Sequence, residues 1–213
     1  MDCSDKDSGG LPFGPPLFLE TIKLQGGSYR LLDLHQRRLE RAWSARFGEP
    51  PGFLLEEHLP KPPGPGLFRA RAVYPGPLGP PVATLHPYSF PSPSTLKLTE
   101  DPGISYSDKL LDRKAIDDLK ASCGASDFIL VRNGSLTDSS IANLVFEAED
   151  GLFTPDECLL AGVKRESLLA SGRVKACRIG PESLPRYSKA YFVNAMIDLE
   201  DDVSVLVADI LPL

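Results

Sequence analysis

The first part of the chain alternates apolar and polar positions, a period of two that is typical of strands with one buried face. One such run covers residues 17–24, and a second passes through Tyr29 and Leu31 after a Gly-Gly pair. Two alternating runs joined through glycines predict a β-hairpin. Further strands are expected at residues 67–74, 82–88 and 95–98.

A helical period replaces this alternation after Asp33, which is a suitable N-cap residue. Leu39, Trp43 and Phe47 recur four residues apart, and Gly48 follows them. A glycine directly after an apolar stripe is a common helix end. We therefore predict an amphipathic helix from Asp33 to Phe47.

The second half of the chain mixes both periods. Ser107 or Asp108 can cap a helix that runs to about residue 121, and another helix is expected at residues 163–170 before Gly172. Strands are expected at residues 128–131, 142–146, 174–179 and 190–193.

The mixture of strands and helices predicts an α/β (α+β) fold. A Pro-Ser-Pro segment at residues 91–93 is a stiff connection typical of a boundary between domains. We expect a flexible tail over residues 1–15, a small N-terminal α+β domain over 16–92 and a larger C-terminal domain over 93–213.

Composition narrows the possible partners and the cellular location. The 213 residues carry a formal net charge of −6 without a basic cluster, so we do not expect the protein to bind nucleic acid. The apolar runs are too short or too interrupted to span a bilayer, and the polar start is unlike a secretory signal. The four cysteines and three histidines are scattered, which favours free thiols in a cytoplasmic protein over disulfides or a zinc site.

Five short segments carry candidate chemistry, and their order and separation are more specific than any one of them. They are residues 34–39 (Leu-His-Gln-Arg-Arg-Leu), 105–113 (Ser-Tyr-Ser-Asp-Lys-Leu-Leu-Asp-Arg), 133–144 (Asn-Gly-Ser-Leu-Thr-Asp-Ser-Ser-Ile-Ala-Asn-Leu), 154–165 (Thr-Pro-Asp-Glu-Cys-Leu-Leu-Ala-Gly-Val-Lys-Arg) and 192–195 (Phe-Val-Asn-Ala).

Together these segments resemble the class IV aminotransferase family, the fold-type IV enzymes that use pyridoxal 5′-phosphate (PLP). The family includes branched-chain and D-amino acid aminotransferases and aminodeoxychorismate lyase, and the resemblance covers about residues 16–207. It implies a small-molecule amino substrate and a two-domain fold in which residues 93–213 bind PLP. It also implies a homodimer with the active site between the two lobes of each subunit.

The resemblance implies that Lys109 forms the Schiff base with PLP and then moves the proton at the substrate α-carbon. At the start of the predicted helix, the helix dipole and partial burial would favour the neutral, nucleophilic amine. By its position alone, Lys109 could equally be an ordinary surface lysine.

An acid is expected to face the pyridine nitrogen and keep it protonated. Asp138 matches the position where most of the family has a glutamate, so the charge is kept on a side chain one methylene shorter. The alternative is that Asp138 lies in a simple turn with its polar neighbours.

The cofactor phosphate needs hydrogen-bond donors from three segments. The resemblance assigns Arg38, the backbone of Val163 and Lys164 at a helix N-terminus, and Asn194 with Ala195. The alternative for Arg38 is a solvated position on the helix surface.

Two further residues match family positions near the ring and the substrate. Leu160 matches the side chain that packs on one face of the ring, although a leucine in such a run can simply be core. His35, three residues from Arg38 and so on one side of the helix, matches a histidine on the substrate side. A structural histidine is the alternative.

Family membership determines the cofactor better than the reaction. The short chain favours 4-amino-4-deoxychorismate lyase, which releases pyruvate and forms 4-aminobenzoate for folate biosynthesis. An amino acid transaminase is the first alternative, and a non-catalytic relative is the second. A carboxylated substrate could be received by basic residues whose place the sequence does not give: Arg69, Arg71 and Arg132.

Overall fold

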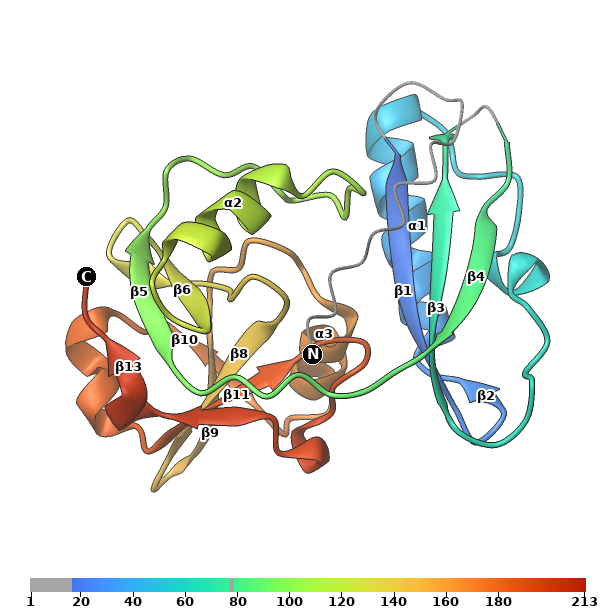
Figure 1. Cartoon of the computed structure of the whole chain (residues 1–213). Helices are drawn as coiled ribbons and strands as arrows, with labels where there is room; N and C mark the ends of the chain where they lie inside the picture. The colour runs from blue at the N-terminus through green and yellow to red at the C-terminus, as the bar shows by residue number, and fades with distance from the viewer. Residues whose placement is uncertain (1–16, 77–78) are drawn as a thin grey trace.

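The computed structural model describes residues 17–76 and 79–213, so the predicted tail over residues 1–15 lies outside the described residues. The described elements form three sheets with one longer α-helix and two shorter ones (Figure 1). This mixed architecture confirms the predicted α/β (α+β) class. The predicted domain boundaries at residues 92 and 93 stay a prediction.

The first sheet is antiparallel and contains the predicted hairpin. Its order is β2 (Ser28–Tyr29), β1 (Phe18–Gln25), β3 (Leu67–Tyr74) and β4 (Val82–Pro87). Helix α1 (Leu32–Phe47) packs on this sheet through a core that includes Ile22, Leu39 and Trp43. The alternating pattern is what directs these apolar side chains toward the helix.

The start of α1 differs from the prediction, while its end agrees with it. Leu31 is the N-cap residue, in a left-handed conformation with φ 52°, and it offers no side-chain cap. Asp33 lies within the first turn, where it pairs with Arg37 at 3.5 Å. Gly48 ends the helix with φ 82°, a conformation that glycine adopts without steric cost.

The other two sheets form the C-terminal part of the chain. One has the order β13 (Ile210–Leu211), β5 (Leu96–Glu100), β6 (Asp127–Arg132) and β7 (Ser135–Leu136). The other has the order β10 (Lys175–Cys177), β9 (Gly151–Pro155), β8 (Asn143–Ala148), β11 (Lys189–Val193) and β12 (Ser204–Leu206). Short 3₁₀ helices occur at Leu55–His58, Pro181–Arg186, Leu199–Asp201 and Val207–Asp209.

Helix α3 (Val163–Ala170) agrees with the prediction, but helix α2 (Lys114–Ser122) begins later than predicted. The preceding segment pairs with β1 instead: Leu19 N donates to Lys109 O and Leu111 N donates to Leu17 O, both at 2.9 Å. A backbone used in this extended pairing cannot also be helical. Lys109 therefore lies in a loop, and the predicted helix-dipole effect on it is wrong.

In Figure 1, β1, β2, β3, β4 and α1 lie together on one side, and the elements labelled from β5 onward lie on the other. The chain that leads from β4 to β5 connects the two groups. Within residues 17–76 and 79–213, no helix combines the length and apolar composition that crossing a bilayer requires.

Candidate active site

A cavity of about 630 Å³ lies where β1 and α1 face the C-terminal elements. It brings together seven of the nine residues predicted for the site, which come from all five of the segments that carry candidate chemistry. These are Arg38, Lys109, Asp138, Leu160, Val163, Asn194 and Ala195. The other two, His35 and Lys164, do not line the cavity. His35 contacts Glu20, and Lys164 pairs with Asp198.

Lys109 lines this cavity from the loop that pairs with β1. Burial lowers the pKa of its amine to about 7, and the positive charge of Arg38 adds to the effect while Glu20 opposes it. An amine with this pKa is largely neutral just above pH 7, whereas an ordinary lysine is charged. The structure thus supplies a nucleophilic amine by burial and by neighbouring cations.

Arg38 and His35 share one buried carboxylate, that of Glu20 on β1. Arg38 donates from Nε to Oε1 at 2.9 Å and from Nη2 to Oε2 at 2.5 Å, and His35 Nδ1 lies 2.6 Å from Oε2. Burial raises the pKa of Glu20, but Arg38 and His35 outweigh it and hold this pKa at about 2.

Burial also lowers the pKa of His35, against the effect of its hydrogen bond with Glu20. The neutral ring must then donate from Nδ1, because a carboxylate can only accept. A buried, neutral ring that is bound to Glu20 is what the alternative for His35, a structural histidine, requires. Arg38 is buried rather than solvated, so the solvated alternative for Arg38 is wrong.

Asp138 is 5 % exposed and accepts two hydrogen bonds that fix its carboxylate. Asn143 Nδ2 donates to Oδ1 and Leu160 N donates to Oδ2, each at 2.9 Å. Its backbone is extended, since Leu130 N donates to Asp138 O at 3.0 Å, so the turn alternative is wrong. Burial raises the pKa of Asp138 to about 6 against the hydrogen bond from Leu160.

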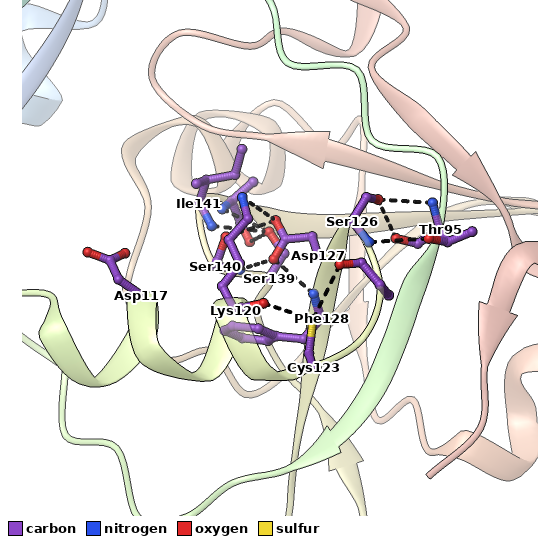
Figure 2. Close-up of polar contacts among 12 residues, drawn as sticks. Thr95, Asp117, Lys120, Cys123, Ser126, Asp127, Phe128, Ser139, Ser140 and Ile141 are labelled. Carbon is purple, nitrogen blue, oxygen red and sulfur yellow. Dashed lines mark hydrogen bonds and ion pairs between the residues drawn. The ribbon is translucent and has the colours of Figure 1, made fainter. Parts of the chain in front are cut away.

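The turn that follows Asp138 is held from behind by a second buried carboxylate, Asp127 (Figure 2). Ser140 donates to it from Oγ at 2.8 Å and from its backbone N at 3.2 Å. Lys120 on α2 pairs with the same carboxylate at 3.8 Å. Because Ser139 and Ser140 line the cavity, Asp127 fixes one of its walls.

The N-terminus of α3 approaches the cavity closely at Gly162. A Cβ atom placed on Gly162 would overlap the side chain of Asn143, so this position requires glycine. The N–H groups of Val163 and Lys164 begin the helix, where no earlier carbonyl of the helix can accept them. The side chain of Lys164 turns away to Asp198.

Asn194 uses its side chain within its own turn. Its Oδ1 accepts from the backbone N of Met196 at 2.8 Å and of Ile197 at 3.1 Å, and its Nδ2 donates to Ile141 O at 3.0 Å. Its own N–H donates to Ile197 O. Of this predicted pair, the N–H of Ala195 is therefore the group left for a ligand.

The three arginines whose place was open are now located. Arg69 lines the cavity from β3. Arg71 is close enough to lower the pKa of Lys109, after burial and nearer charges. Arg132 lies elsewhere, bound to Asp101 at 2.6 Å. Among the described residues, no group of His, Cys, Asp and Glu side chains is arranged to hold a metal ion.

Comparisons with known proteins bear on the family and the fold of the chain. No family model matches the chain. An uncharacterized protein of Haemophilus influenzae is 33% identical over 190 residues, which is 85% of this chain and 97% of that protein. A crystal structure from Haemophilus somnus, provisionally named a 4-amino-4-deoxychorismate lyase, is 27% identical with a TM-score of 0.77, over 86% of this chain and 98% of its own.

A hypothetical aminotransferase from Mycobacterium tuberculosis, solved in its PLP-bound form, shares the fold with a TM-score of 0.64. It is 16% identical and the match covers 91% of this chain and 81% of that one. The chain belongs to the class IV aminotransferase family. The resemblance of its five segments is thereby confirmed at the level of family and fold.

The residues of this cavity fit the PLP that the family uses. A buried carboxylate with a raised pKa, Asp138, faces the cavity without a direct cationic hydrogen-bond partner, as a site for a protonated ring nitrogen should. The neutral amine of Lys109 and the uncrowded backbone at Gly162 suit an aldehyde and a phosphate, respectively.

Several residues that shape the site were missed by sequence analysis. Glu20 and Lys23 are buried charges on β1, and Thr21 between them lines the cavity. Two charged residues within an otherwise apolar strand were a visible signal, because such charges need partners. Asp198 gave no signal of this kind, since its partners Lys23 and Lys164 are distant in sequence.

Proposed function

We propose that the protein binds PLP through Lys109 and acts as a 4-amino-4-deoxychorismate lyase. The substrate is cleaved to pyruvate and 4-aminobenzoate, an elimination that requires no added oxidant or acceptor. The observation that carries the proposal is the single cavity in which Lys109, with a pKa near 7, lies with the buried carboxylate of Asp138.

PLP supplies the electron sink of the reaction when bound. In this proposal, Lys109 binds the cofactor and moves the proton at the substrate α-carbon, and its pKa near 7 allows both proton uptake and release at neutral pH. Asp138 holds the proton on the ring nitrogen, and Leu160 packs against the ring.

The phosphate would be held by N–H groups of Val163, Lys164 and Ala195, with Arg38 as the cation on the opposite wall. Two of the guanidinium donors of Arg38 are engaged by Glu20, which leaves the others for a second anion. Glu20 therefore acts on Arg38 as a positioning residue.

The lyase is preferred over the transaminase because of the similarity to the Haemophilus somnus structure over nearly its full length. Arg69, Arg113 and Lys120 also line the cavity, so a carboxylated substrate would meet positive charge there.

The cofactor test is a visible absorption band on adding PLP to the purified protein. We expect the band in the wild type and its loss in Lys109→Ala. Lys114→Ala is the matched control, because Lys114 lies on the exposed side of α2 and pairs with Asp118. No band in the wild type with added PLP would overturn the proposal.

The reaction is tested by pyruvate release from 4-amino-4-deoxychorismate. Release without an added keto acid supports the lyase, and dependence on a keto acid acceptor indicates the transaminase. A PLP band without turnover of either kind would identify a non-catalytic relative.

We also propose that the protein is a cytoplasmic homodimer, as the family resemblance implies. Sedimentation equilibrium of the PLP-loaded protein tests the assembly. A single monomeric species at micromolar concentration would contradict the dimer and leave the lyase proposal to its own assay.

A further inference from the structure

A cluster of four charged side chains lies beside the two segments that are proposed to hold the phosphate. These segments, called the phosphate turns below, are the N-terminus of α3 at Val163–Lys164 and the turn at Asn194–Ala195. Lys23 Nζ lies 2.7 Å from Asp198 Oδ2 and 3.2 Å from Asp201 Oδ2. Lys164 Nζ pairs with the other carboxylate oxygen of Asp198. The backbone N of Asp198 also donates to Asp201 Oδ2 at 2.8 Å, so two lysines and two aspartates form one connected group.

The cluster joins three segments that are distant in sequence. Lys23 belongs to β1 and Lys164 is the second residue of α3. Asp198 directly follows the turn in which Asn194 binds Met196 and Ile197. Asp198 is therefore the link between the turn at residues 194–197 and the helix N-terminus at residues 163–164.

Burial makes this link demanding. The side chain of Lys23 is only 1 % exposed and that of Lys164 is 15 % exposed. A buried ammonium without a partner is strongly unfavourable, so the carboxylate must stay between the two lysines. Burial raises the pKa of Asp198, but Lys164 and Lys23 outweigh it and keep this carboxylate ionised.

We propose that Asp198, bound by Lys23 and Lys164, is a positioning residue for the cofactor phosphate. It sets the separation of the Val163–Lys164 and Asn194–Ala195 backbones so that both donate to one phosphate. The side chain of Lys164 then acts through Asp198 rather than on the phosphate. This inference rests on the proposed binding of PLP.

The test compares PLP with pyridoxal, which has the same ring and aldehyde without the phosphate. In Asp198→Asn, we expect the Kd for PLP to rise about tenfold or more, as loss of a charged hydrogen-bond partner does. The Kd for pyridoxal should stay within about twofold of the wild type. Pyridoxal has an uncharged hydroxymethyl group in place of the phosphate ester, so it makes no use of the phosphate turns. Both are measured by titration of the visible band.

Glu200→Gln is the matched control. Glu200 lies in the 3₁₀ helix Leu199–Asp201, which directly follows Asp198. Its side chain is largely exposed and pairs with Arg173 at 2.7 Å, so it is not part of the buried cluster. We expect neither Kd to change. Lys23→Met removes the other cation that binds Asp198 and leaves Lys164 in place, so it should repeat the PLP-specific loss, whereas direct contact of Lys164 with the phosphate predicts none; this keeps the test valid if Asp198→Asn does not fold.

The sign of the change separates this inference from direct contact of Lys164 with the phosphate. Removal of the Asp198 charge would release Lys164, while Lys23 keeps its pair with Asp201, so direct contact of Lys164 predicts tighter PLP binding in Asp198→Asn. Tighter binding, an unchanged Kd, or an equal loss for PLP and pyridoxal would each overturn the inference. A wild type that binds neither compound would instead refute the proposed function.

Discussion

Lys109 lies in a loop and within reach of the charges of Arg38, Arg113 and Arg71. With burial, these cations lower its pKa from 10.5 to about 7. The amine is therefore reactive at neutral pH without any contribution from a helix dipole. Its protonation state follows from side chains that are distant in the sequence.

We expect the rate of PLP capture to depend on pH with a midpoint of about 7. Below that pH the amine is protonated and cannot attack, so the rate should fall about tenfold per pH unit, and above it the rate should level off. Stopped-flow measurement of the visible band from pH 5.5 to 9 checks this. A rate that keeps rising to pH 9 would show an ordinary lysine.

Burial shifts the pKa of Asp138 in the opposite direction to that of Lys109, from 3.8 up to about 6. For a carboxylate with a raised pKa in the folded state, ionisation costs stability, and the cost grows from pH 4 and is complete above pH 6. The effect of Asp138→Asn on the stability of the PLP-free protein should therefore be more favourable at pH 7.5 than at pH 4 by up to about 3 kcal/mol, on top of a pH-independent loss of one of the two hydrogen bonds that the carboxylate accepts.

The same Asp138→Asn variant should bind PLP more weakly, because the ring nitrogen loses its anionic partner. Urea unfolding at the two pH values and titration with PLP measure the two effects. Equal stability changes at both pH values would show that the Asp138 carboxylate carries no cost in the folded protein.

At the scale of elements, the N-terminus of α3 and the segment after β7 that carries Asp138 are joined through Gly162 and Asn143. Gly162→Ala would place a Cβ on the Asn143 side chain, which donates to Asp138. We expect a loss of PLP affinity of about tenfold or more from this displacement. Gly52→Ala, where a Cβ meets nothing within 4 Å, is the control and should leave the affinity unchanged.

Helix α1 and strand β1 are joined through Glu20, which binds Arg38 and His35. Glu20→Gln leaves a buried guanidinium without its anion, so the free energy of unfolding should fall by about 3 kcal/mol or more. Asp33→Asn removes the exposed pair with Arg37 on the same helix and should cost about 0.5 kcal/mol or less. Urea unfolding compares them, and similar losses would contradict the structural role of Glu20.

For the whole molecule, the Lys109 segment pairs with β1 while the phosphate turns belong to the C-terminal elements. PLP should therefore connect both groups of elements and raise the unfolding temperature of the whole chain by several degrees at a hundredfold excess over its Kd. Differential scanning calorimetry measures this. An equal rise in Lys109→Ala would show binding that does not depend on the lysine.

Much of the fold could be predicted from local patterns. The hairpin at β1 and β2, strand β3 and helix α3 follow the hydrophobic period, and Gly48 marks a helix end. Strand β7 was missed although Asn133 and Gly134, with φ 53° and 73°, form a tight hairpin turn, a signal that the sequence does contain. The start of α2 was not readable, because long-range pairing with β1 overrides local propensity.

The sequence by itself determined the fold class, the family and seven of the residues that line the cavity, since five ordered segments carry that information locally. Only the tertiary structure decided how their charges are matched. Glu20 binds Arg38 and His35, Asp198 pairs with Lys23 and Lys164, and burial lowers the pKa of Lys109. Electrostatic interactions depend on distance and burial, and the folded chain sets both between residues that are far apart in sequence.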